Sequence, residues 1–477
     1  MSTMSSVSST PLRTVAGGGA APGAPSRSLP RAGPPSTGAA PRTVRWATDA
    51  RLAPIIAKVE RGERLSREDG LTLFETRDLH AVCALADLVR TRMHGDRAYY
   101  NVNRHLNYSN ICALSCKFCA FYRKKGDDGA YEHSLDDVRR EAIAAAEAGA
   151  TEMHIVGGLH PTLPFSHYTD MLRTIREAAP QLHLKAFTAV EIVHLARISR
   201  RWKDRVEGIR AVLADLKDAG LGSLPGGGAE VFDDRVHDEA YKGKIRSDEW
   251  LDVHRVAHEL GLNTNATILY GHIEERAERI HHMMLLREQQ DRTLRAWAAA
   301  QGIALAPDVD RASSGERDGA SAPAGAVVLG GPASAYPRER LPRVGATGLS
   351  TGYFQTIIPL PFFPDESELQ RLPGPTGLEN LRTLAIARLM LDNFPHVKSF
   401  WIMQTLPMAQ LMLQNGADDV DGTVVWYDIT KAVGDGTHQE TSVADLKRAI
   451  REAGYVPVER DTLYREVIRD GRNWRVA

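Results

Sequence analysis

The stretch Cys112-Ala-Leu-Ser-Cys116-Lys-Phe-Cys119 holds three of the 4 cysteines in a chain of 477 residues. Each iron that a protein binds in a [4Fe–4S] cluster takes one Cys sulfur, so three thiolates hold three irons. The fourth iron is then open to an exchangeable ligand, and an open coordination position favours chemistry over a structural role. We therefore expect Cys112, Cys116 and Cys119 to bind a cluster. A zinc site completed by His105 or His133 is the alternative, although zinc ligands usually come as two pairs.

The composition limits the classes of partner. Lys and Arg number 59 against 60 Asp and Glu, and this balance gives no support for binding nucleic acid. No window of the sequence approaches the roughly 20 apolar residues that a membrane helix needs. Four cysteines are too few for a disulfide framework, and Cys83, in an apolar helical stretch, is expected to be a buried small residue. We expect a cytoplasmic protein with no nucleic-acid or membrane partner.

The chain divides by composition into four parts. The first is rich in Ala, Gly, Pro and Ser and cannot bury enough apolar surface to order itself; an organellar transit peptide is the alternative. A helical segment, a core and a C-terminal extension follow, and a second tract rich in Ala, Gly and Pro interrupts the core as a flexible insertion. The expected parts are a disordered tail 1–45, a helical segment 46–98, a core 99–435 with the insertion 297–352, and an extension 436–477.

Within the core, strand-like and helix-like segments alternate, and the first strand begins near Tyr99 and leads to the cysteines. Such alternation indicates parallel strands with crossover helices. We predict an α/β fold of the TIM type, a partial or full (β/α) barrel with an N-terminal helical extension, whose active site lies at the carboxyl ends of the strands. An open doubly wound sheet is the alternative. Further strands are expected at 151–156, 183–188, 222–224, 263–270, 355–361 and 397–403, and helices at 135–148, 206–219 and 247–260.

Several of these strands end in glycine or polar residues. Gly157 and Gly158 follow one strand, and Gly226 and Gly227 follow another; glycines let a backbone approach a ligand without Cβ interference. A plain strand-to-helix turn would also explain them. Glu191 closes a third segment, where it can accept hydrogen bonds from ribose hydroxyls or an amine. It can equally be a carboxylate that interacts with the N-terminus of a helix.

The spacing Cys112-x₃-Cys116-x-Phe118-Cys119 resembles the signature of the radical S-adenosylmethionine (SAM) superfamily at every position. The resemblance implies a [4Fe–4S] cluster whose open iron is chelated by the amino and carboxylate groups of SAM. It also implies a glycine-rich segment for the methionine amine where Gly157 and Gly158 stand. The expected cofactor-binding residues are Phe118, Gly157, Gly158, Glu191, Gly226 and Gly227.

Longer stretches resemble one family within that superfamily, the aminodeoxyfutalosine synthases of menaquinone biosynthesis. This resemblance implies an external one-electron donor, such as flavodoxin or ferredoxin, and a 5′-deoxyadenosyl radical. The radical would add to the vinyl carbon of the enolpyruvyl benzoate 3-[(1-carboxyvinyl)oxy]benzoate and give 6-amino-6-deoxyfutalosine after aryl migration. Arg104, His272 and the face of Asn265 and Thr267 are candidates to hold the two substrate carboxylates. The stretches are 99–107, 154–161, 185–191, 223–230, 268–274 and 416–423.

Three other functions remain open at this point. Dehypoxanthine futalosine cyclase and the deazaflavin synthases share the cysteines and the glycine-rich turns. A non-catalytic Fe–S or zinc protein is the third alternative, although an electron-transfer protein would normally complete its cluster with four ligands.

Overall fold

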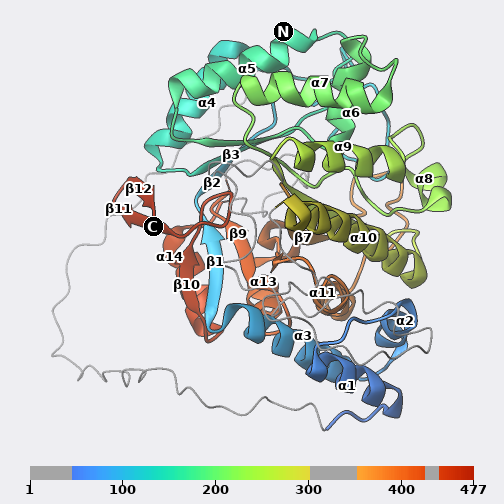
Figure 1. Cartoon of the computed structure of the whole chain (residues 1–477). Coiled ribbons are helices and arrows are strands. Elements are labelled where there is room, and N and C mark those ends of the chain that lie inside the picture. Colours follow the sequence, from blue (N-terminus) through green and yellow to red (C-terminus); the bar gives the residue numbers. More distant parts are fainter. Residues whose placement is uncertain (1–45, 301–351, 425–439) are drawn as a thin grey trace, which may run out of the picture. The chain divides into compact units, whose positions relative to one another are not determined.

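The computed structural model describes residues 46–300, 352–424 and 440–477. Its centre is a seven-stranded sheet in which every pair of neighbouring strands is parallel and the strand order follows the chain. A doubly wound sheet reverses its strand order at a switch point, so this alternative is excluded. The sheet curls into a half-barrel (Figure 1), which confirms the partial form of the predicted barrel. The strands are β2 (Asn103–Leu106), β3 (Glu152–Ile155), β4 (His183–Ala186), β5 (Ser223–Leu224), β6 (Asn263–Tyr270), β7 (Phe354–Pro361) and β8 (His396–Val397).

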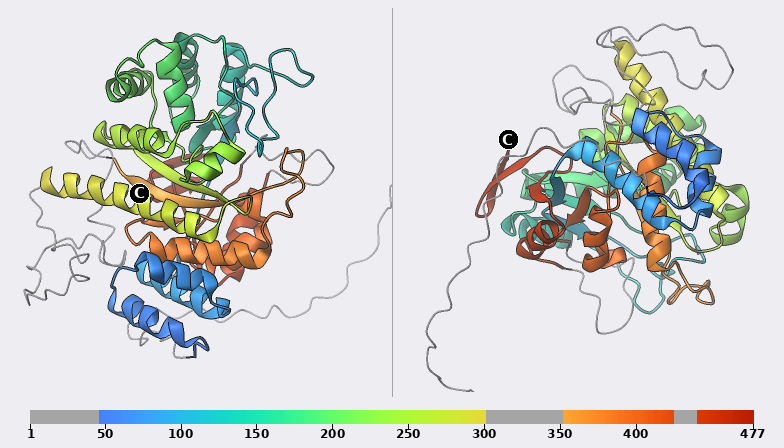
Figure 2. Two further views of the ribbon diagram at one scale, coloured as in Figure 1. Left: turned by 90° about the vertical axis from the view of Figure 1, so that its right-hand side faces the viewer. Right: turned by 90° about the horizontal axis from the view of Figure 1, so that it is seen from below.

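Crossover helices flank the outside of the half-barrel (Figures 1 and 2). Their apolar faces produce this packing: Val138, Ala142 and Ala145 of α4 are buried at helical spacing. The hydroxyl of Ser134 accepts a hydrogen bond from the backbone of Asp137 at 3.2 Å, as its position before the helix predicts. The helices are α4 (Leu135–Glu147), α5 (Phe165–Ala178), α6 (Ala189–Ile198), α7 (Arg205–Asp218), α8 (Asp234–Ala240), α9 (Ser247–Glu259), α10 (Arg276–Ala300) and α11 (Gly377–Met390).

The segment before the sheet is helical, as predicted, and Ser66 and Asp69 form the expected capping box. Among the described helices, none combines the length and apolar character needed to cross a bilayer. The helical segment packs against the last crossover helices, since α3 contacts α11 and α2 contacts both α10 and α11. Its elements are η1 (Ala50–Leu52), α1 (Ala53–Arg61), α2 (Arg67–Glu75) and α3 (Leu79–His94).

The predicted single strand from Tyr99 is wrong, because the chain forms two strands that break at Val102. The first, β1 (Arg97–Asn101), belongs to a separate parallel sheet between β9 (Asp419–Gly422) and β10 (Val456–Glu459) (Figure 1). The second, β2, opens the half-barrel. The C-terminal residues thus pair with the start of the core. The remaining C-terminal elements are α14 (Val443–Glu452) and the hairpin of β11 (Val467–Asp470) and β12 (Asn473–Val476).

Strand β9 contacts both edge strands of the half-barrel. Asp419 forms an isolated bridge with Lys398, which directly follows β8. Thr423, just beyond β9, exchanges hydrogen bonds with Asn103 at the start of β2, at 3.2 and 3.3 Å. The second sheet therefore delivers side chains into the interior of the half-barrel.

The strand predicted at 397–403 is also wrong, except for its first residue, Val397. Strand β8 ends at Val397, and the apolar run after it forms α12 (Trp401–Gln404), followed by α13 (Leu406–Leu413). A short apolar run fits a buried strand and a buried helix equally well, so periodicity alone did not separate them. The long helix α10 continues beyond residue 297, where we expected the insertion to begin. The rest of that insertion, the tail 1–45 and the boundary at 435 lie outside the described residues.

Candidate active site at the carboxyl ends of the strands

A cavity of about 300 Å³ lies at the carboxyl end of the half-barrel. Its lining residues follow the strands of the sheet in turn, as expected of a barrel active site. The three cysteines of the triplet line it together with Phe118, Gly157, Gly158, Glu191, Gly226, Gly227, Asn265 and Thr267.

The cysteine loop follows β2 and is tied to the turn after β3. The backbone N–H groups of Leu114 and Leu159 each lie 3.4 Å from the sulfur of Cys112 and donate to it. Ala113 N donates to Leu159 O at 2.8 Å, which holds the loop against the turn. Burial raises the pKa of Cys116 to about 11; a bound metal would deprotonate the thiol outright. Three sulfurs on one cavity, two N–H donors to one sulfur, and the fourth cysteine away on α3 fit an iron–sulfur cluster with three protein ligands.

Phe118 and Lys244 flank the cysteines. The Phe118 ring packs edge-on against Tyr241 at a centroid distance of 6.0 Å, and the Lys244 ammonium lies 5.1 Å from the Phe118 centroid. Lys244 is ion-paired with Glu230. The predicted aromatic residue thus lines the same cavity as the cysteines, and the ion pair of Lys244 and Glu230, which the sequence did not reveal, lies next to its ring.

Gly157 and Gly158 are required by packing. A Cβ on Gly157 would lie 2.6 Å from the Tyr108 ring, and a Cβ on Gly158 would lie 2.3 Å from the carbonyl oxygen of Ile111. Both glycines line the cavity as predicted. Their lack of a Cβ lets the turn after β3 pack directly on the cysteine loop.

Glu191 joins three elements at the cavity wall. Its carboxylate accepts hydrogen bonds from the hydroxyl of Tyr108 at 2.8 Å, from Gly157 N at 3.1 Å and from Thr188 N at 2.7 Å. The last contact completes a capping box at the start of α6. Burial raises the pKa of Glu191 to about 7. The helix-terminus interpretation is therefore confirmed, and the same carboxylate also reaches the cavity.

The glycines after β5 differ from each other. A Cβ on Gly226 would lie 2.6 Å from the backbone of Ala266, whereas one on Gly227 would meet only the Thr188 methyl group, at 3.1 Å. The carbonyl of Gly226 accepts a hydrogen bond from Thr267 at 2.7 Å. Gly226 thus sets the spacing between β5 and β6, and Gly227 has free space toward the cavity.

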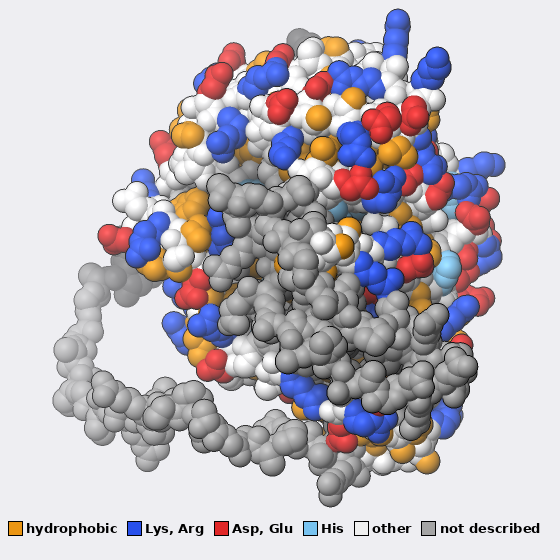
Figure 3. Space-filling model, viewed as in Figure 1, with side chains coloured by type: hydrophobic (Ala, Val, Ile, Leu, Met, Phe, Trp, Pro, Cys, Tyr) orange, Lys and Arg blue, Asp and Glu red, His pale blue; other side chains and the backbone are white. Residues whose placement is uncertain are grey.

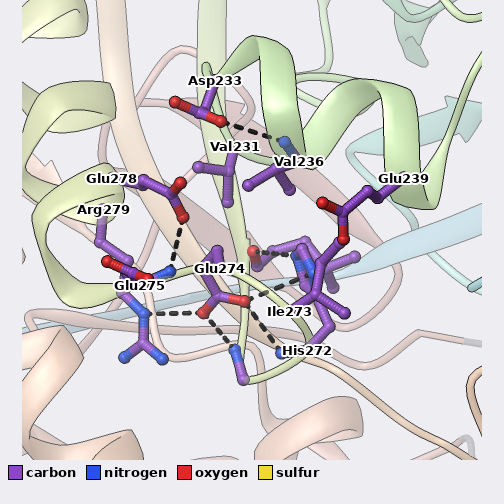
Figure 4. A network of polar contacts seen from close by, with 12 residues as sticks. Val231, Asp233, Val236, Glu239, His272, Ile273, Glu274, Glu275, Glu278 and Arg279 are labelled. Atoms are coloured by element: carbon purple, nitrogen blue, oxygen red, sulfur yellow. Dashed lines mark hydrogen bonds and ion pairs between the residues drawn. The ribbon is translucent and has the colours of Figure 1, made fainter.

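Arg104 and His272 do not line the cavity. Arg104 donates to the carbonyl oxygen of Asn103 at 3.1 Å and to the Thr423 hydroxyl at 3.3 Å. The buried His272 ring contacts the carbonyl oxygen of Leu269 at 3.1 Å and lies 3.4 Å from the Glu274 carboxylate (Figure 4). Arg104 thus binds a carbonyl and a hydroxyl oxygen, and His272 contacts a carbonyl oxygen and a carboxylate, away from the cavity.

Two lysines that sequence reasoning missed do line the cavity. Lys185 lies in β4 and is ion-paired with Glu152, and Lys398 pairs with Asp421 of β9 at 2.8 Å. A lysine inside an otherwise apolar strand was the available signal for Lys185. Nothing local marks Lys398, whose partner lies 23 residues further along the chain.

Two family models match the chain. The model of the radical SAM superfamily covers residues 106–286, which include the cysteine triplet. The model described as the CofH/MqnC C-terminal region covers residues 350–470.

Individual relatives extend over most of the chain. An aminodeoxyfutalosine synthase of Thermus thermophilus is 40% identical over 428 residues, which are 89% of this chain and 98% of that protein. The synthase of Streptomyces coelicolor is 40% identical over 426 residues, 87% and 93% of the two chains. A 5-amino-6-(D-ribitylamino)uracil–L-tyrosine 4-hydroxyphenyl transferase of Methanosphaerula palustris is 33% identical over 87% of this chain and 97% of that protein.

Among solved structures, methylornithine synthase has the same fold, with a TM-score of 0.58 over 84% of this chain and 96% of that chain, at 14% identity. The resemblance first read from the cysteine spacing thus extends to the fold and to nearly the whole sequence. The chain belongs to the radical SAM superfamily, in the family that includes the aminodeoxyfutalosine synthases.

Proposed function

We propose that this chain is an aminodeoxyfutalosine synthase, which transfers the adenosyl group of SAM to the vinyl carbon of 3-[(1-carboxyvinyl)oxy]benzoate. After the aryl ring migrates and the vinyl carboxylate is lost as a one-carbon unit, the product is 6-amino-6-deoxyfutalosine, a precursor in menaquinone biosynthesis. The observation that carries the proposal is one cavity lined both by the three-cysteine loop and by polar strand ends, in a chain 40% identical to two such synthases.

Cys112, Cys116 and Cys119 would hold a [4Fe–4S] cluster, and Glu191 and the turn at Gly157 and Gly158 would hold SAM beside it. Cluster and SAM together supply a 5′-deoxyadenosyl radical when bound. The residues of the chain orient and protect the reactants. The N–H groups of Leu114 and Leu159 would hold the Cys112 sulfur in place for the cluster.

One part of the cavity wall, formed by β7 and the segment after β8, is apolar. Ile358, Leu360, Phe400 and Met403 line it and belong to a small apolar cluster apart from the main core. Such a wall excludes water, which protects a primary carbon radical from side reactions. It also offers a surface on which the aromatic ring of a benzoate substrate can be oriented.

The external partners follow from the same chemistry. The reaction needs a one-electron donor such as flavodoxin or ferredoxin, and such carriers occur in the cytoplasm, where we infer that the protein works. Figure 3 shows Lys and Arg side chains interspersed with Asp and Glu on the coloured part of the face in view. With a net charge of -1, the chain gives no indication of a nucleic-acid partner.

The test is an anaerobic assay of the reconstituted protein with SAM, dithionite and the enolpyruvyl benzoate, followed by mass spectrometry. We expect a product that carries the adenosyl group, and none from a Cys119→Ala variant. Release of unmodified 5′-deoxyadenosine with no adduct would instead indicate hydrogen abstraction of the cyclase or deazaflavin-synthase type and would refute the proposal.

A further inference from the structure

Two buried ammonium groups face the cavity from different sides of the half-barrel. Lys185 projects from β4, Lys398 follows β8, and three strands separate β4 from β8 in the sheet. The two residues are 4% and 2% exposed. Burying a charge is costly unless it is paired, and each ammonium has one carboxylate partner, Glu152 or Asp421.

The two ammonium groups are close enough to repel each other. Burial lowers the pKa of Lys185; the Glu152 carboxylate opposes this effect, and the Lys398 charge adds to it. An ammonium has three N–H donors. The Asp421 carboxylate, which also lines the cavity, already acts on both ammonium groups. One hydrogen-bonded carboxylate for each lysine still leaves donors on both groups that can turn toward an anion in the cavity.

Lys185 lies deeper in the half-barrel than the cysteines, and Lys398 directly follows the carboxyl end of β8. Lys185 pairs with the first residue of β3, whereas the cysteine loop begins beyond the carboxyl end of β2. The apolar wall of Ile358, Leu360, Phe400 and Met403 lines the same cavity. The cavity thus offers three cysteine sulfurs, an apolar wall and two lysines, Lys185 and Lys398, which we call the cationic floor.

We propose that Lys185 and Lys398 together bind the benzoate carboxylate of the substrate. This inference rests on the proposed function and names the specificity-determining residues of that site. The substrate carries one carboxylate on its vinyl group and the other on the aromatic ring, meta to the ether oxygen. With the vinyl group directed toward the cysteines, the ring lies along the apolar wall and the ring carboxylate reaches the lysines. Arg104 and His272, the candidates from the sequence, are outside the cavity.

The first experiment changes the substrate and leaves the protein intact. The free acid is compared with its methyl ester at the benzoate carboxylate, by isothermal titration for Kd and by the anaerobic assay for KM. The ester keeps a carbonyl acceptor but loses the negative charge, which removes about one hydrogen bond to a charged group, so we expect it to bind roughly 10- to 100-fold more weakly. Equal Kd values for the acid and the ester would overturn the inference.

The second experiment removes the charge pair from the protein. The variant Lys398→Gln/Asp421→Asn leaves no unpaired buried charge, and Asn tolerates the positive φ of 72° at position 421. We expect its KM for the acid to rise roughly 10- to 100-fold and its preference for the acid over the ester to disappear. Lys58→Gln is the matched control, because Lys58 pairs with Asp69 at 2.7 Å outside the cavity.

Two further readings separate the possible failures. Iron content after anaerobic reconstitution should equal wild type in the double variant, which shows that the cluster site is intact. A double variant that keeps wild-type KM and wild-type preference would refute the lysine site while the proposed function stands. A wild-type protein that makes no adduct from the acid would refute the proposed function itself.

Discussion

Replacing Gly158 with Ala should disable the cluster site, because this glycine is the point where the turn after β3 packs on the cysteine loop. The new Cβ would lie 2.3 Å from the oxygen and 2.7 Å from the carbon of the Ile111 carbonyl, next to the first cysteine. Real Cβ contacts essentially never fall below 3.0 Å, so the two backbone segments must separate by about 0.7 Å. Overpacking of this kind costs about 1–3 kcal/mol.

The separation also weakens the contacts that orient Cys112. Leu159 N, the residue after Gly158, already lies 3.4 Å from the Cys112 sulfur, and a shift of this size takes it beyond hydrogen-bond range. We expect Gly158→Ala to retain its secondary structure by circular dichroism but to bind much less iron after anaerobic reconstitution. Gly377→Ala is the control, since its Cβ would meet only the flexible end of Met408. Wild-type iron content in Gly158→Ala would refute the packing argument.

Three further outcomes are expected. Arg388→Met removes one partner of the buried Asp418 carboxylate, which keeps its contacts with His396 at 2.6 Å and Val397 N at 2.8 Å. The loss of this charged hydrogen bond should lower the free energy of unfolding by about 1.5–3 kcal/mol in urea titrations of the apoprotein. Arg448→Met, in an exposed pair, should change it by less than about 1 kcal/mol, and similar losses in both would contradict the argument. Burial raises the pKa of Glu191 to about 7 from 4.5, so between these pH values the folded state holds a proton that the unfolded chain has released. This group therefore makes the free energy of unfolding fall as pH rises from about 4.5 to 7. Glu191→Gln should flatten the pH profile of stability in that window, and an unaltered slope would argue against the shift. Burial raises the pKa of the Cys83 thiol to about 12, so iodoacetamide at pH 8 should leave Cys83 unlabelled in the native apoprotein, which peptide mapping checks. Cys83→Ala should keep full iron content by iron analysis.

The sequence predicted the half-barrel well where a strand is long and bounded by glycine. Residues 263–270 form β6 with the predicted limits, between Gly261 and Gly271. The prediction failed where pairing over a long distance decides the structure. Whether the chain breaks at Val102 depends on β9 and β10, more than 300 residues away, and no local pattern records that.

The candidate site also divides into residues that a local pattern predicts and residues that only the folded chain brings together. The cysteine triplet is local in sequence, so its spacing alone predicted the three candidate ligands, which line one cavity in the structure. Arg104 and His272 follow the expected pattern of polar residues in or near strand ends, yet neighbouring backbone carbonyls engage both side chains. The cationic floor was missed because Lys398 and Asp421 meet only after β9 has joined the half-barrel.

The pairing of β1 with β9 and β10 sets the order in which the molecule can be made. During synthesis β1 leaves the ribosome before any of the crossover helices, with Ala98, Tyr99 and Tyr100, which the finished fold buries, still without a partner. Pairing partners this far apart in the chain are the slowest kind to find each other. Since β9 also supplies Asp421, the cationic floor of the cavity is completed only in the last stage of folding, after the cysteine loop and its turn can already have formed. A nascent chain could thus acquire iron before it can recognise a substrate.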